Sequence, residues 1–130
     1  MERLTAVAGT VVRIHADTVF VMAQDSIYTS PQTASGGFGT DFVAEQTGLT
    51  SMAVNANGVY WTVSGDAETA NGALRTCPLS GCPDSGPLEL ATGQAQPTSL
   101  HVVGGFAYWL NRNVPGAANA NSVMRVSISQ

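Results

Sequence analysis

The amino-acid sequence predicts an all-β protein made of three four-stranded β-propeller blades, and three observations lead to this prediction. A segment of strand-like composition occurs clearly at residues 50–61 (TSMAVNANGVYW) and 98–109 (TSLHVVGGFAYW), with a diverged copy at 10–21. The copies begin at residues 10, 50 and 98, so they recur after 40 and then 48 residues, a period typical of propeller blades. No apolar spacing of 3.6 residues persists for three turns, so we expect no helix of consequence.

Composition narrows the class of protein and of partner. The chain has 130 residues, of which 44% are hydrophobic and 11% charged, which suits one well-buried all-β domain rather than a disordered segment. Its formal net charge is −4, and it has five arginines scattered along the chain and no lysine. Because binding to nucleic-acid phosphates needs clustered Lys and Arg, we expect no nucleic-acid partner. No apolar run approaches the ~20 residues of a membrane-spanning helix, so no membrane partner is expected either.

The first blade is expected to cover about residues 10–48. Alternating apolar side chains predict its first strand, and a turn at 16–18 reverses the chain into the second. A loop rich in Gly and Ser at 33–40 leads into the last strand. The four strands are predicted at residues 11–15, 19–22, 26–30 and 41–44.

The second blade repeats this order over about residues 49–97. Asn57-Gly58 predicts a type I′ hairpin turn, in which both central residues have positive φ. The polar residues 64–71 join the second strand to the third. The four strands are predicted at residues 51–55, 59–63, 73–77 and 87–91.

The third blade is expected over about residues 98–130, with Gly104-Gly105 in its hairpin turn and a long loop at 111–121. Its strands are predicted at residues 99–103, 106–110 and 122–128, so that its fourth strand is missing. The third strands of the blades align at three apolar positions and one pair of arginines: Ile27, Leu74 and Met124, and Arg75 with Arg125.

The two cysteines, Cys77 and Cys82, bracket the sequence PLSG in the second blade. A tight turn there would bring their Cα atoms within disulfide range, although two free thiols remain an alternative at this point. A zinc site is disfavoured because two cysteines supply only half of a tetrahedral ligand set.

The missing strand predicts how the protein assembles. Propellers typically need four to eight blades, and an open arc of three would expose two apolar faces. Two copies make six, so we expect a homodimer in which the strand at residues 2–6 (ERLTA) of each copy completes the last blade of the other. The alternative is that the chain is a piece of a longer single-chain propeller.

Three segments carry a family resemblance: SMAVNANGVYWTV, GALRTCPLSGC and LELATGQAQPTSL. They resemble the repeats of predicted secreted bacterial propeller proteins, which are similar in turn to the YWTD repeats of the low-density lipoprotein receptor family and to NHL repeats. The match is good over residues 48–97, fair over 98–128 and weak over the first blade. Val63 and Asn111 stand where the Asp of YWTD would be. The resemblance implies six-bladed geometry and an extracellular or periplasmic setting. The amino terminus does not look like a signal peptide, so we expect a mature or excised domain. No activity is implied.

Two basic residues are candidate ligand-binding positions on the first strands of their blades. His101 is expected between blades near the ring axis, either as a hydrogen-bonded structural histidine or as a channel ligand for a metal or a substrate. Arg13 is its counterpart in the first blade, where its charge could bind an anion.

The remaining candidates lie on loops. Asp66 and Glu68 share the loop at 64–71, and two carboxylates fall short of the six to eight oxygens that Ca²⁺ takes. Asn111 and Arg112 begin the polar loop of the third blade. Polar loops on one face of a ring suit recognition of a ligand or partner.

Two functions follow as hypotheses. The first is a non-catalytic binding or interaction propeller whose ligand is a glycan, a peptide or a small molecule. The second is a metal-dependent enzyme of the propeller lactonase or lyase kind with an axial site. The first strands of the blades are almost all apolar, which favours the binding module. We assign no catalytic residue, no metal ligand and no cofactor. The aromatic residues Tyr60, Trp61, Tyr108 and Trp109 are expected in the core rather than in a carbohydrate-stacking site.

Overall fold

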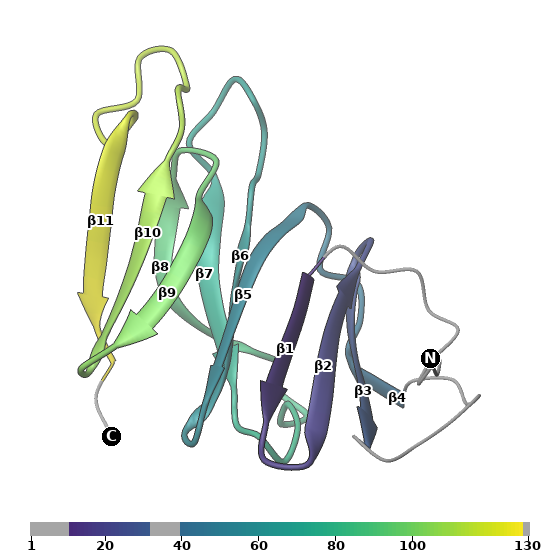
Figure 1. Ribbon diagram of the computed structural model, residues 1–130. Helices are drawn as coiled ribbons and strands as arrows, with labels where there is room; N and C mark the ends of the chain where they lie inside the picture. Colours follow the sequence, from purple (N-terminus) through teal and green to yellow (C-terminus); the bar gives the residue numbers. More distant parts are fainter. Residues whose placement is uncertain (1–10, 32–39, 129–130) are drawn as a thin grey trace.

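The computed structural model describes residues 11–31 and 40–128. These residues form eleven β-strands in three antiparallel sheets and no helix (Figure 1), which confirms the predicted all-β class. No sheet closes on itself in the described part of the chain. Eleven of the twelve predicted strands are present. The twelfth, at residues 2–6, lies outside the described residues, as does the predicted loop at 33–40 except for Thr40.

Sheet 1 holds the first four strands in sequence order. Its strands are β1 (Val11–His15), β2 (Thr18–Ala23), β3 (Ser26–Pro31) and β4 (Thr40–Val43). The apolar alternation that predicts this sheet corresponds to its hairpin register, in which Val12 lies opposite Val21 and Ile14 opposite Val19.

Sheet 2 repeats the same strand order. Its strands are β5 (Leu49–Asn55), β6 (Gly58–Val63), β7 (Gly72–Cys77) and β8 (Leu88–Gln94). The β5–β6 hairpin is confirmed, but the type I′ turn predicted at Asn57-Gly58 is wrong, because neither residue has positive φ. The Asn55 side chain forms the turn instead: its Oδ1 accepts the N–H groups of Asn57 (2.8 Å) and Gly58 (3.2 Å). Gly58 is needed for close approach, since a Cβ there would lie 2.6 Å from the carbonyl oxygen of Cys77.

Sheet 3 has three described strands, in the order β11-β10-β9. They are β9 (Thr98–Val103), β10 (Phe106–Asn111) and β11 (Ser122–Ser127). Its β9–β10 turn does have positive φ at both central residues, Gly104 (58°) and Gly105 (84°). Among the described strands β11 pairs only with β10, so that β11 forms one edge of the sheet.

The predicted alignment of Met124 with Leu74 is wrong by one residue. Trp61 lies opposite Arg75 in sheet 2, and Trp109 lies opposite Met124 in sheet 3, so Met124 is the structural counterpart of Arg75. A one-residue slip exchanges the two faces of a strand. Met124 therefore packs against the core, while Val123 takes the position of Leu74 and is exposed.

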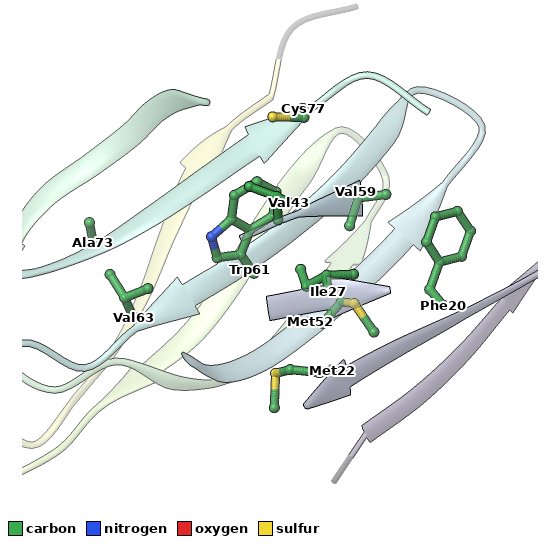
Figure 2. Packing of buried hydrophobic residues seen from close by; sticks show 10 residues of the cluster. All are labelled: Phe20, Met22, Ile27, Val43, Met52, Val59, Trp61, Val63, Ala73 and Cys77. Atoms are coloured by element: carbon green, nitrogen blue, oxygen red, sulfur yellow. The ribbon is translucent and has the colours of Figure 1, made fainter. Parts of the chain in front are cut away.

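Sheet 2 lies between the other two sheets, and both of its faces are buried. Strand β6 alternates between them: Val59, Trp61 and Val63 face sheet 1, and Tyr60 faces sheet 3. Figure 2 shows the first cluster: Phe20, Met22, Ile27 and Val43 of sheet 1, with Met52, Val59, Trp61, Val63, Ala73 and Cys77 of sheet 2. The second cluster joins Ala53, Tyr60 and Leu74 of sheet 2 to Leu100, Ala107, Trp109 and Ile128. Trp61, Tyr60 and Trp109 are thus core residues, as predicted. Tyr108 was also expected in the core but is only half-buried, because it lies on the face of sheet 3 that points away from sheet 2.

Candidate functional site

The outer face of sheet 3, which points away from sheet 2, is apolar and exposed. Val103, Leu110 and Val123 lie there, with Val123 72% exposed. A cavity of about 250 Å³ on this face is lined by Leu110 and Val123 together with Tyr108 and His101. Exposed apolar area of this kind marks surfaces that contact another molecule.

An aromatic and basic edge extends the same outer face. The Phe106 and Tyr108 rings lie 6.1 Å apart, and the guanidinium of Arg125 stacks 4.4 Å from the centre of the Phe106 ring. Arg125 lies opposite Tyr108 in the β10–β11 register, which places it on the same side of the sheet. The guanidinium covers one end of the apolar face.

The outer face of sheet 1 carries the second exposed apolar set. Val12 is 54% exposed and Ile14 is 59% exposed, beside the buried Val19 and Val21. The protein therefore presents apolar side chains at both ends of its row of three sheets (Figure 1).

Hairpin register relates these free faces to the buried ones. Each sheet has an aromatic residue at the same position of its second strand, namely Phe20, Tyr60 and Tyr108. Phe20 packs in the cluster with sheet 2, and Tyr60 packs in the cluster with sheet 3. Tyr108 lies at the equivalent position with no further described sheet beside it.

The opposite faces follow the same rule. In β2, β6 and β10 the residue after the shared aromatic position is Val21, Trp61 and Trp109, respectively. Trp61 packs toward sheet 1 and Trp109 toward sheet 2, whereas Val21 points to the outer side of sheet 1. The outer face of sheet 3 is thus equivalent to the face of sheet 1 that packs on sheet 2, and to the face of sheet 2 that packs on sheet 3. The outer face of sheet 1 is equivalent to the face of sheet 2 that packs on sheet 1, and to the face of sheet 3 that packs on sheet 2.

Arg13 and His101 occupy equivalent positions, as predicted, because they lie opposite Phe20 and Tyr108. Both side chains are exposed. The guanidinium Nη1 of Arg13 donates a 2.9 Å hydrogen bond to the carbonyl oxygen of Val12. Within one chain the two residues do not meet, because strand β5 lies between β1 and β9.

Asp66 organises its own loop. Its Oδ2 accepts hydrogen bonds from Thr69 Oγ1 and from Asn71 Nδ2, each 3.2 Å long, and its N–H donates to Asn71 Oδ1 (2.6 Å). Glu68 is exposed beside it. In the described ranges no three His, Cys, Asp or Glu side chains come together as metal ligands would.

Asn111 is buried and bonded on both sides of its amide. Its Oδ1 accepts the indole N–H of Trp109 (3.0 Å), and its Nδ2 donates to Gln94 Oε1 (3.0 Å) and to the carbonyl of Asn119 (3.1 Å). Arg112 is exposed, and its Nε donates to the carbonyl of Gln96 (2.9 Å). These bonds anchor the base of the loop at 111–121 to the connection between sheets 2 and 3.

Gln46 and Gln94 form hydrogen bonds that the sequence analysis did not predict. Gln46 Oε1 accepts the indole N–H of Trp61 (3.0 Å) and Nη1 of Arg75 (2.8 Å), and Gln94 reaches Trp109 through Asn111. The signal was in the repeat, because each glutamine stands four residues before the threonine that begins a copy. Each connection between sheets thus fixes the tryptophan of the sheet that follows.

Cys77 and Cys82 form a disulfide, with their Cα atoms 4.9 Å apart, so the disulfide alternative is confirmed. The turn that it closes borders a cavity of about 490 Å³ between sheet 2 and Ile128. A second cavity, of about 480 Å³, lies at the equivalent place on sheet 1, with Phe20 in the position of Tyr60.

Replacing Cys77 and Cys82 together by serine is expected to lower the free energy of unfolding by about 2 kcal/mol. The bond closes a loop across a sequence separation of 5, and short loops give the smaller entropic gains. Urea unfolding of the double variant and of the parent protein measures the difference. An unchanged midpoint would show that the bond does not stabilise the turn.

Comparison with known proteins yields no relative: no family model, no curated protein and no solved structure matches the chain. No helix that could span a membrane is found among residues 11–31 and 40–128. The disulfide in a small all-β chain is compatible with an extracellular location, because such bonds persist in oxidising compartments.

Proposed function

We propose that the protein is a non-catalytic β-propeller interaction module, related to YWTD and NHL-like repeats, that assembles as a homodimeric ring of six blades. One observation carries the proposal. The two free faces of the chain occupy the positions by which its own sheets pack together, so the outer face of sheet 3 fits the outer face of sheet 1 of a second copy.

The order of the strands supports a propeller arrangement. The first strands of the three sheets, β1, β5 and β9, are neighbours, as the innermost strands of blades are. The N–H of Leu100 in β9 donates to Ser51 Oγ in β5 (3.1 Å), which ties two of these strands together. Each sheet runs from this inner strand outward in sequence order.

The edge of sheet 3 supports strand exchange. Sheets 1 and 2 have four strands each, and sheet 3 has three in the described part of the chain. An open edge such as β11 favours pairing with an added strand. The segment at residues 2–6 of a second copy would supply it.

The solution mass tests the proposal. Light scattering of the purified protein is expected to give twice the 13.4 kDa of one chain, with no dependence on concentration in the micromolar range. A folded species of one-chain mass would overturn the ring.

The polar loops at 64–71 and 111–121 lie at the same end of the sheets (Figure 1), where a ring would present them to a ligand.

A further inference from the structure

We propose that the cavity beside the disulfide turn is a binding site for a neutral, mainly apolar small molecule that carries a hydroxyl group. At about 490 Å³ the cavity has the size of a site for a drug-sized ligand. The described residues that line it come from sheet 2, the disulfide turn and Ile128 of one chain.

The walls of the cavity are apolar and covalently braced. Leu88 and Leu90 of β8, Ile128 after β11 and the prolines Pro78, Pro83 and Pro87 line it. Proline has a fixed φ and no N–H group, and the Cys77–Cys82 bond closes the turn that contains Pro78 and leads directly into Pro83. A wall built in this way is largely formed before a ligand arrives, which lowers the ordering cost of binding.

Tyr60 is one of four residues with polar side chains that line the cavity, together with Asn57, Thr76 and Ser85. The Tyr60 side chain is only 4% exposed, yet no described residue forms a hydrogen bond with its hydroxyl. Nearby, Thr76 Oγ1 donates to the carbonyl of Val59 (2.8 Å) and keeps its capacity to accept. The Tyr60 hydroxyl is not buried without a partner but stays in contact with the open space of the cavity, where a ligand hydroxyl that pairs with it gains affinity.

Charge decides which ligands the cavity excludes. None of the described lining residues carries a charged side chain. A carboxylate, phosphate or ammonium would lose its hydration there without a counter-charge. A sugar is disfavoured too, because the Tyr60 ring packs among Leu74 and Leu100 and leaves no free aromatic face for stacking.

The equivalent cavity on sheet 1 shows how specific the arrangement is. There Phe20 replaces Tyr60, so the hydroxyl is missing, and the lining includes Asp41 and His15. The two cavities, at equivalent places on sheets 1 and 2, are therefore similar in volume but differ in the chemistry of their lining residues. Of these two equivalent cavities, the one on sheet 2 combines uncharged lining residues with a tyrosine.

Three naphthalene probes and the Tyr60→Phe variant test the proposal by fluorescence titration. The parent protein is expected to bind 2-naphthol, and to bind the anionic naphthalene-2-sulfonate at least about tenfold more weakly. Tyr60→Phe is expected to weaken 2-naphthol about fivefold and to leave unsubstituted naphthalene within about twofold, because it removes one hydrogen bond and keeps the ring.

Two further variants separate the possible outcomes. Leu88→Ala, at an exposed wall position, should weaken 2-naphthol and naphthalene alike. Val123→Arg, on the outer face of sheet 3, should leave both affinities unchanged even if it alters the mass of the protein, so that failure of the dimer is not mistaken for failure of the site. The proposal is overturned if the parent protein binds no probe, if it binds the sulfonate as tightly as 2-naphthol, or if Tyr60→Phe weakens 2-naphthol and naphthalene equally.

Discussion

Replacing Trp61 by alanine is expected to lower the free energy of unfolding by about 3–5 kcal/mol, a large part of the stability of a small domain. The indole is fully buried at the centre of the cluster between sheets 1 and 2. Its removal leaves a cavity that strands paired on both sides of β6 cannot collapse to fill. Urea unfolding monitored by circular dichroism measures the loss.

Trp61→Phe is the matched control. It keeps an aromatic ring in the core but removes the N–H that donates to Gln46 Oε1. We expect a smaller loss than for alanine, because most of the buried area remains. If both variants unfold within about 0.5 kcal/mol of the parent protein, Trp61 does not hold the two sheets together.

Replacing Val123 by arginine is expected to raise the dissociation constant of the proposed dimer by at least about 100-fold. Val123 is 72% exposed in one chain, so the substitution should leave the fold of that chain intact. In the ring the guanidinium would be buried against the apolar side chains of Val12, Val19 and Val21. Sedimentation velocity at several concentrations measures the change.

Thr92→Arg provides the control for added charge. Thr92 is exposed on β8, in sheet 2, and lies outside the faces that the ring would join. The Thr92→Arg variant should sediment as the parent protein does. Equal behaviour of both variants would mean that the outer face of sheet 3 is not part of an interface.

Periodicity in the sequence was enough to predict the strands. Alternation of apolar residues at period two, repeated three times, places all eleven described strands near their observed positions. The extent of β8 was underestimated, since it runs to Gln94 rather than ending at residue 91. Its last residues, Thr92 and Gly93 (exposed) and Gln94 (buried), show no apolar alternation that would have revealed it.

Two errors, in a turn type and in a strand alignment, have different physical causes. Asn57-Gly58 is a strong hairpin signal, yet Asn55 Oδ1 captures both N–H groups and sets a different turn. The alignment of Arg75 with Arg125 shifted the third strand by one residue, because matching residue types do not reveal which face they occupy.

The candidate sites were the least predictable part. The buried position of Asn111 follows from contacts with Gln94 and Trp109, and the sequence gives no measure of such contacts across a sheet boundary. The cavity beside the disulfide is bordered by the turn after Cys77, in which Leu79 and Cys82 pack against the cluster between sheets 1 and 2. By contrast, the equivalence of Arg13 and His101 was predicted correctly because it rests on the repeat alone.

Small-angle X-ray scattering of the parent protein tests the central claim most directly, because it reports mass and shape together. The ring predicts a particle of twice 13.4 kDa whose distance distribution is that of a compact, closed disc of six sheets. A particle of 13.4 kDa, or a two-chain particle with the elongated profile of two arcs joined at one end, would contradict it.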